Sequence, residues 1–374
     1  MRLLIFIHSL SSGGAERVTA NLANHWSKQA WDVTVVTLTP CSGDFFPLAG
    51  AVRRISLDAA GDSTNLLAAL ANNARRIRAL RHVLQTEKPD IALAMMNTAS
   101  VLLALAAAGL PVACIGAERE QPSMSRSVLA WSFLRRLAYG RLNAVVALTS
   151  ETAAWIERKS AVKQLSVIPN AVLWPLPESP PWVSPNSVGQ PSRKRLLAVG
   201  RLARVKGIDR LLDAFARLAP RHPDWELVIV GEGTERNALQ NQINAAGLSG
   251  QAFLPGQTGS VADWYRSAQL FVMSSRHEGF PNALMEAMAH GLPAVSFDCE
   301  AGPRHIIRHE VDGLLVPTGD VAALTTALDR MMGDGELRER YAARAGEVRE
   351  RFSESRIQSL WQQLFDKVID ARRR

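Results

Sequence analysis

The stretch from Leu270 to Pro293 constrains the fold of this 374-residue chain more than any other part of it. Its first four residues, LFVM, are all apolar and predict a short buried strand. The residues SSRHEGFP follow, and their glycine and proline predict a tight loop. NALMEAMAH then predicts a helix, because Asn is a favoured cap and strong helix formers follow it, and Gly291 with Pro293 predicts its end.

The start of this predicted helix is a candidate site for an anion. The N–H groups of the first helical turn face the loop and attract phosphate. Glu278 lies in the loop and Glu286 lies one turn into the helix. A carboxylate does not usefully touch a phosphate, but it accepts hydrogen bonds from sugar hydroxyls. The combination predicts a binding site for a nucleotide sugar, whereas Glu286 taken alone fits a solvated helix face equally well.

The string HEGFPNALMEAMAHGLP resembles the Glu-x7-Glu signature of the family-four retaining glycosyltransferases, which have two Rossmann-like domains in the GT-B arrangement. The resemblance implies that Glu278 holds hydroxyls of the donor sugar and that Glu286 holds the ribose. It also implies that the start of the helix binds the donor diphosphate, through Gly279, Phe280, Pro281 and Asn282.

A second string, GRLARVKG, follows the segment Lys194–Val199, which is predicted to be the buried first strand of a second domain. The string matches the diphosphate-binding segment of the same family, which implies that Arg201 and Lys206 stabilise the leaving group. Taken alone, each is a solvated surface cation. In the family, the GEG turn at Gly231 and the turn after the next strand, at Leu254, enclose the base.

Neither an Asp-x-Asp motif nor a His/Asp metal cluster occurs in the sequence. Cations and backbone amides must then stabilise the charge of the leaving group, which is a case of preorganised electrostatics. We therefore expect an enzyme that uses no metal and no cofactor. Retention of the anomeric configuration is implied by the family resemblance alone.

The first half of the chain repeats the alternation of strands and helices. Gly13 and Gly14 stand at a predicted strand-to-helix turn, where glycine lets the backbone approach a ligand closely. Their segment, SGGAER, resembles the first loop of the glycosyltransferase family and implies a contact with the donor. It is not the G-x-G-x-x-G fingerprint, which disfavours a nicotinamide-dependent dehydrogenase.

The loop AEREQPSMSR follows the predicted strand at 112–116, at a sheet edge where α/β proteins bind ligands. It resembles the Glu-Arg-Asn segment of family members that act on lipid-diphosphate-linked sugars, with Glu120 in place of the Asn. The resemblance makes Glu118 the catalytic candidate on the acceptor side and Arg119 an acceptor-binding candidate.

Positive charge is concentrated in residues 1–170, which contain 18 Lys and Arg against 11 Asp and Glu, out of a net charge of +8 for the chain. A basic half suggests an anionic partner: membrane lipid, a phosphate-linked acceptor or nucleic acid. Two segments join basic and apolar residues, 75–82 and 126–141. We assign Arg75 and Arg76 to acceptor binding, and the alternatives are a solvated face and a packed helix with extended arginines.

The long apolar stretch 91–117 is broken by polar residues, Gly109 and Pro111, and is interpreted as strand, helix and strand rather than a membrane span. The apolar run at the N-terminus is too short for a signal peptide. Three widely spaced cysteines form no metal or redox motif, which favours a reducing compartment. We therefore expect a cytoplasmic protein attached peripherally to the inner face of the cell membrane, with no nucleic-acid partner.

Six prolines in 174–192 predict a linker between two α/β domains. The expected domains are 1–173, with a last helix at 354–374 packing back on it, and 193–353. Each is expected to be a doubly wound sheet, the two facing across a cleft as in GT-B enzymes. The expected reaction moves a hexose or N-acetylhexosamine from a UDP-linked donor to a polyprenyl-diphosphate-linked acceptor in bacterial surface glycan synthesis. Alternatives are a sugar-nucleotide 2-epimerase of the same fold and a non-catalytic basic membrane-binding protein.

Overall fold

A computed structural model describes residues 1–11, 13–61, 66–119 and 129–373. The chain divides into two compact units. Unit 1 comprises Met1–Asn170 and Gln358–Arg374, and unit 2 comprises Ala171–Ile357. Glu120 and Arg126, which the sequence analysis singled out, lie outside the described residues.

Within the described residues, unit 1 is built on a seven-stranded parallel sheet of order β3-β2-β1-β4-β5-β6-β7. Its strands are β1 Arg2–Ile7, β2 Asp32–Thr37, β3 Arg53–Ser56, β4 Ile91–Met95, β5 Ala113–Ala117, β6 Ala144–Ala147 and β7 Leu165–Val167. The order reverses between β1 and β4, as in a doubly wound sheet.

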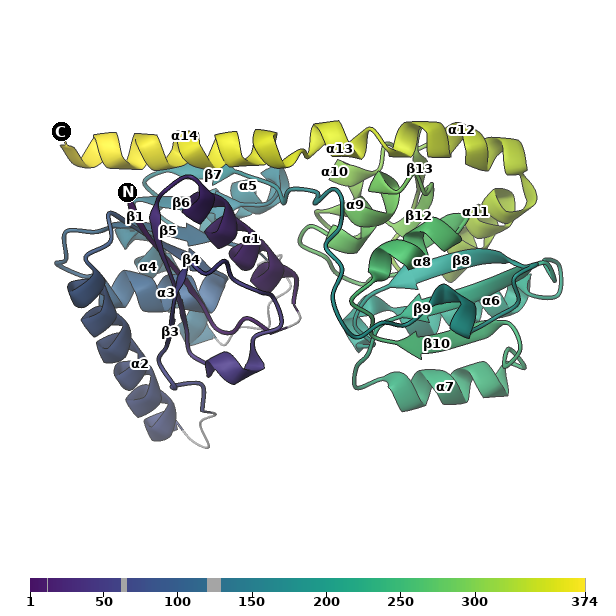
Figure 1. Cartoon of the computed structure of the whole chain (residues 1–374), viewed down its shortest axis with the longest axis horizontal. Helices are drawn as coiled ribbons and strands as arrows, with labels where there is room; N and C mark the ends of the chain where they lie inside the picture. The colour runs from purple at the N-terminus through teal and green to yellow at the C-terminus, as the bar shows by residue number, and fades with distance from the viewer. Residues whose placement is uncertain (12, 62–65, 120–128, 374) are drawn as a thin grey trace. The chain divides into compact units, whose positions relative to one another are not determined.

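Helices cover both faces of this sheet (Figure 1). They are α1 Gly14–Lys28, α2 Leu66–Glu87, α3 Asn97–Ala106, α4 Leu129–Arg141, α5 Ser150–Lys159 and α14 Glu354–Arg373. A hydrophobic core joins α2, α3, α4 and α5 to the strands. The last helix, α14, packs on α1, since the ring of Phe365 lies 5.6 Å from that of Trp26.

Unit 2 has a six-stranded parallel sheet of order β10-β9-β8-β11-β12-β13. Its strands are β8 Lys194–Val199, β9 Trp225–Val230, β10 Ala252–Gly256, β11 Leu270–Met273, β12 Ala294–Phe297 and β13 Gly313–Val316. Its helices are α6 Ile208–Leu218, α7 Arg236–Ala245, α8 Val261–Ser267, α9 Asn282–Ala289, α10 Pro303–Ile306, α11 Val321–Gly333, α12 Gly335–Ala345 and α13 Val348–Arg351.

Apart from the edge strands β3 and β7, the strands of both sheets are buried along most of their length. A parallel strand covered by helices on both faces carries apolar side chains on both, so it appears in the sequence as a continuous apolar run. This confirms the prediction of two Rossmann-like α/β sheets. The stretch 91–117 forms β4, α3 and β5, and no helix among the described residues is long and apolar enough to cross a membrane.

The proline-rich segment 174–192, expected as the linker between the two domains, packs on unit 2. Gly259 N–H donates to the Pro181 carbonyl at 2.8 Å, and the indole N–H of Trp264 donates to the Val183 carbonyl at 2.9 Å. The buried Arg195–Glu226 ion pair, at 2.7 Å, holds the end of the segment through a bond from Gln190 N–H to Glu226 at 3.0 Å. The prolines fix an ordered covering of α8 rather than a flexible spacer.

Candidate functional site

The candidate site lies at the carboxyl edge of the unit 2 sheet, where the strand order reverses between β8 and β11. Ligands of doubly wound sheets bind at this position. The two strings singled out in the sequence meet here, because one follows β8 and the other follows β11. Ser274 Oγ donates to the Lys206 carbonyl at 3.1 Å, and Arg276 N–H donates to the Val205 carbonyl at 2.8 Å.

Two glycines permit this close approach of loops. Gly207 has φ of 62°, and a Cβ there would lie 2.1 Å from the Ser274 carbonyl oxygen. Gly231 has φ of 149°, and a Cβ there would lie 2.0 Å from the Gly200 carbonyl oxygen. Both positions therefore combine a backbone conformation that favours glycine with a contact that leaves no room for a side chain.

Lys206 and Glu278 contact each other directly, although the sequence analysis gave them separate roles. Lys206 Nζ lies 2.6 Å from Glu278 Oε1, and Ser275 Oγ donates to the same oxygen at 2.6 Å. Their side chains are 27% and 10% exposed, so the pair is partly screened from solvent but still reachable. A lysine ammonium has three N–H donors, which leaves Lys206 able to contact a further anion.

The charge of Glu278 also affects the pKa of Cys299, which lies just after β12. Burial, with the Glu278 carboxylate adding to it, raises the pKa of the Cys299 thiol to about 12. The thiol is therefore protonated at neutral pH, as expected for a structural cysteine.

Arg201 is the second cation predicted at this site, and it is exposed directly after β8. Its guanidinium forms no hydrogen bond or ion pair with any residue in the described ranges. An arginine side chain offers five N–H donors in a planar fork that matches phosphate geometry. Arg201 thus has its full donor set available for an anion, whereas Lys206 shares its charge with Glu278.

Helix α9 begins differently from the expectation that Asn282 caps it. Pro281 occupies the cap position, Asn282 is the first helical residue, and no side chain of the described residues forms the cap bond. Proline at the cap has no side-chain acceptor, so the N–H groups of the first turn remain oriented toward the loop. Phe280 is buried against Phe352, with ring centroids 5.3 Å apart, which anchors the residue before the helix.

Glu286 is only 6% exposed, so the alternative of a solvated helix face is wrong. The hydroxyl of Tyr265 donates to its Oε2 at 3.1 Å. The apolar residues beside it, Leu284, Met285 and Met288, are buried in the core as expected. Leu254, predicted beside the base, has a buried side chain, and its carbonyl accepts from Arg236 at 2.8 Å. A contact between Leu254 and the base stays a prediction.

The predicted residues on the acceptor side are buried in unit 1. Glu118 is 2% exposed and accepts from the hydroxyl of Tyr139 at 2.6 Å. Burial, followed by the charge of Glu118, raises the pKa of Tyr139 well above its usual value. Because its carboxylate is engaged in the interior, Glu118 presents no open surface to an acceptor, and its catalytic role stays a prediction.

Arg119 is similarly enclosed, with 7% of its surface exposed. Its guanidinium donates to Asn170 Oδ1 at 3.0 Å and lies 5.5 Å from the ring centroid of Trp361. Burial lowers the pKa of Arg119 to about 10, which still leaves it charged at neutral pH. These contacts join β5 to the segment after β7 and to α14. An acceptor-binding role for Arg119 stays a prediction.

The glycine pair at the start of α1 makes a close approach to a side chain of the protein itself. A Cβ at Gly13 would lie 2.0 Å from Glu16 Oε2, and Ser9 Oγ donates to Glu16 Oε1 at 3.3 Å. Gly14 is exposed. A carboxylate at this turn repels a diphosphate and accepts from hydroxyls. The sequence analysis missed Glu16, whose place in the first turn after two glycines was the available signal.

The arginines of α2 separate into two kinds. Arg75 and Arg78 are exposed, one turn apart on the same helix face. Arg76 instead donates to the carbonyls of Ala59 and Gly61 at 2.7 and 2.8 Å. Arg81 donates to the carbonyls of residues 106 and 108 at 2.9 and 2.7 Å, at the end of α3. Arg76 and Arg81 therefore hold unit 1 together, and Arg75 and Arg78 face solvent.

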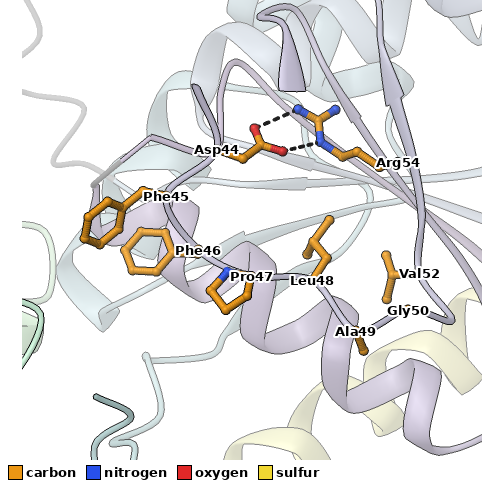
Figure 2. Close-up of a pocket in the computed structure, with 9 residues that line it drawn as sticks. All are labelled: Asp44, Phe45, Phe46, Pro47, Leu48, Ala49, Gly50, Val52 and Arg54. Carbon is orange, nitrogen blue, oxygen red and sulfur yellow. Dashed lines mark hydrogen bonds and ion pairs between the residues drawn. The ribbon is translucent and has the colours of Figure 1, made fainter. Parts of the chain in front are cut away.

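A separate hollow of about 430 Å³ is lined by residues 44–50, Val52 and Arg54, which belong to the segment that connects β2 to β3 and to the start of β3 (Figure 2). Figure 2 shows Arg54 paired with Asp44 through two contacts, at 2.8 and 2.9 Å, and the rings of Phe45 and Phe46 beside each other. Because its arginine is already neutralised, the hollow does not have the free charge that a diphosphate needs. Within the part of the chain that the structure describes, no three His, Cys, Asp or Glu side chains gather so as to hold a metal ion.

Two family models match the chain. The model described as glycosyl transferases group 1 matches residues 184–348, and the model described as Glycosyltransferase Family 4 matches residues 12–172. Together they cover most of both units.

Curated relatives and a solved structure agree with these matches. An exopolysaccharide phosphotransferase of Streptomyces coelicolor is 33% identical over 78% of this chain, which spans only 30% of that longer protein. A Campylobacter jejuni alpha-1,4-N-acetyl-D-galactosaminyltransferase, whose substrate is named as a diNAcBac-PP-undecaprenol glycan, is 27% identical over 99% of this chain and 100% of its own length. The structure of Anabaena HepE in complex with UDP aligns with a TM-score of 0.76 at 19% identity, covering 98% and 99% of the two chains, which shows the shared fold.

Proposed function

The chain belongs to the family-four glycosyltransferases of the GT-B fold, and we propose that it transfers a hexose or N-acetylhexosamine from a UDP-linked donor to a polyprenyl-diphosphate-linked glycan. The family and its relatives place the enzyme in bacterial polysaccharide or lipopolysaccharide synthesis. The lipid-linked acceptor is supported by the substrate named for the Campylobacter relative. UDP is supported by the complex of the Anabaena structure.

The observation that carries this proposal is the cluster of ligand groups at the carboxyl edge of the unit 2 sheet. Arg201 and Lys206, together with the N–H groups that begin α9, would stabilise the negative charge of the leaving UDP. Glu278 would accept hydrogen bonds from hydroxyls of the donor sugar, and the buried Glu286 would hold the ribose. The acceptor hydroxyl would attack the anomeric carbon as the bond to the diphosphate breaks, its proton passing to the departing diphosphate oxygen, with the configuration of the anomeric carbon retained.

Chemistry at this site requires no group beyond those of the chain and its substrates. The cations and amides act on the oxygen atoms that gain charge as the sugar–phosphate bond breaks, which lowers the barrier to breaking that bond. Glu118 stays the candidate catalytic residue on the acceptor side, and its carboxylate accepts from Tyr139 in the interior of unit 1.

The test is mass spectrometry of the products formed from a panel of UDP- and GDP-sugars with an undecaprenyl-diphosphate-linked glycan, in the presence of excess EDTA. The expected result is an acceptor extended by one sugar from a UDP donor. Interconversion of the donor without an acceptor would identify a 2-epimerase instead. Transfer of a sugar phosphate, the activity that the name of the Streptomyces relative suggests, would add a phosphate mass and overturn the proposal.

We also propose that unit 1 contacts an anionic membrane through an exposed basic and apolar surface. On α2 this surface comprises Leu70, which is 60% exposed, with Arg75 and Arg78. Each basic side chain near an anionic leaflet contributes about 1 kcal/mol, so a few of them give reversible attachment without an anchor. Such attachment would keep the enzyme close to a lipid-linked acceptor.

A further inference from the structure

The sequence analysis did not single out the residue that holds the carboxylate of Glu286. Tyr265 lies on α8, is fully buried, and donates its hydroxyl to Glu286 Oε2 at 3.1 Å. We propose that Tyr265 is a positioning residue that orients Glu286 toward the ribose of the donor, an inference that rests on the proposed function.

The hydrogen bond limits the orientations that are open to the Glu286 side chain. A glutamate has three rotatable side-chain bonds, and its two carboxylate oxygens offer about four acceptor positions. The phenol occupies one of these positions on Oε2, and the others serve further partners. A bond from a neutral donor to a charged acceptor is stronger than one between neutral groups. Tyr265 therefore selects one orientation of the carboxylate while leaving it able to accept from hydroxyls.

Packing holds the ring of Tyr265 in place on both sides. The ring centroid lies 6.2 Å from that of Phe271 on β11 and 5.1 Å from that of His290, just after α9. The Nδ1 of His290 lies 2.7 Å from the Glu286 carbonyl oxygen, which can only accept, so this nitrogen carries the proton. Burial lowers the pKa of His290, consistent with a neutral imidazole at neutral pH.

The contacts continue to the segments that enter and leave unit 2. The His290 ring lies 4.6 Å from that of Trp174, and the Arg349 guanidinium lies 3.9 Å from the Trp174 ring centroid. Arg349 Nε also donates to the Ala289 carbonyl at 2.6 Å, at the last residue of α9. Helix α9 is thus fixed at its carboxyl end by the proline-rich segment and by α13, and Tyr265 makes the contact with the carboxylate itself.

The test uses Tyr265→Phe, which removes one oxygen and keeps the ring. Isothermal titration with UDP should show binding weakened roughly tenfold, the order expected for a hydrogen bond to a charged group. The preference for UDP over its 2′,3′-dideoxy analogue should fall by a similar factor, because the misoriented carboxylate no longer distinguishes ribose hydroxyls. If Tyr265 had only a structural role, Tyr265→Phe would weaken binding of both nucleotides equally and leave the preference for UDP unchanged.

Tyr341→Phe is the matched control, since Tyr341 is a buried tyrosine of unit 2 on α12. It should bind both nucleotides as the wild type does. The same Tyr265→Phe change is then made in a Glu286→Gln background, where it should cause no further loss of affinity. Glutamine is uncharged, so the double variant does not bury a carboxylate that has lost its tyrosine partner. The Glu286→Gln variant can therefore be compared with the double variant even if the single Tyr265→Phe variant does not fold.

The outcomes separate this inference from the proposed function. Wild-type affinity in Tyr265→Phe, or an equal loss in the Glu286→Gln background, would overturn the positioning role while the donor site stands. A wild-type protein that binds neither UDP nor GDP would overturn the proposed function itself.

Discussion

Each of the two units contains a buried tyrosine bonded to a buried glutamate, and the surroundings of the two pairs differ. In unit 2, Glu286 of the Tyr265–Glu286 pair lies one helical turn from the start of α9, and the loop before that helix carries Glu278, which is paired with the partly exposed Lys206. In unit 1, the Tyr139–Glu118 pair lies among interior residues. We therefore propose a role in ligand binding for the pair in unit 2 only, and we expect the pair in unit 1 to act on stability.

The strongest test of this contrast concerns the cations of unit 2. Lys206→Ala and Arg201→Ala should each reduce sugar transfer roughly 100-fold, the effect of removing one donor to a charge that develops in the transition state. The measurement is the initial rate with the donor and acceptor that the product screen identifies. Arg204→Ala, an exposed neighbour in the same turn, is the control and should keep its rate. Wild-type rates in both variants would contradict the proposal that Arg201 and Lys206 bind the donor diphosphate.

The next largest effect is expected on the solvent-facing surface of unit 1. Replacing Arg75 and Arg78 by Gln should weaken binding to vesicles with anionic lipid by about 2 kcal/mol, roughly 30-fold, at about 1 kcal/mol for each residue. Sedimentation with vesicles at low salt measures it, and about 1 M NaCl should release the wild-type protein because the screening length falls to about 3 Å.

The two inward-facing arginines of α2 provide the matched comparison. Arg76→Gln with Arg81→Gln changes the net charge by the same amount but removes bonds to backbone carbonyls. That variant should lose thermal stability, and vesicle binding should fall less than in the outward-facing pair. If both double variants weakened vesicle binding equally, or if the wild-type protein did not bind anionic vesicles, Arg75 and Arg78 would be only a solvated helix face.

The carboxylates of unit 2 should divide their effects between nucleotide and sugar. Glu286→Ala should weaken binding of free UDP roughly tenfold through the loss of hydrogen bonds to a charged acceptor. Glu278→Ala should reduce turnover while changing free-UDP affinity little, because its proposed partner is the sugar. Titration calorimetry with UDP alone separates the two, and equal losses of affinity would contradict the division.

The smallest effect belongs to the interior pair of unit 1. Tyr139→Phe should lower the free energy of unfolding by about 1 kcal/mol, because the carboxylate of Glu118 loses a donor in a buried place. UDP affinity should not change. Urea denaturation and calorimetry on the same sample measure both. A loss of UDP affinity with unchanged stability would reverse the comparison between the two pairs.

Local sequence determined the strands, helices and main site motifs of this protein. Apolar runs such as Leu270–Met273 became buried strands because a parallel strand covered on both faces needs apolar side chains throughout. Glycines at 207 and 231 occur where loops approach too closely for a side chain. The strand pattern depends on residues a few positions apart and can be seen in a sequence without knowledge of the fold, whereas Ser274 and Gly200, which the two glycines approach, lie far from them along the chain.

Tertiary structure decided which of these residues touch. Lys206 and Glu278 are 72 positions apart, and they meet because β8 and β11 are neighbours in the sheet. Packing of strands and helices also brings Tyr265 to Glu286 and Tyr139 to Glu118. It places Arg76 against the Ala59 carbonyl, while Arg75 is exposed to solvent. Hydrogen bonds and burial act over a few ångströms in space, whatever the separation along the chain. The residue types therefore came from the sequence, and their partners and exposure came from the packing of strands and helices.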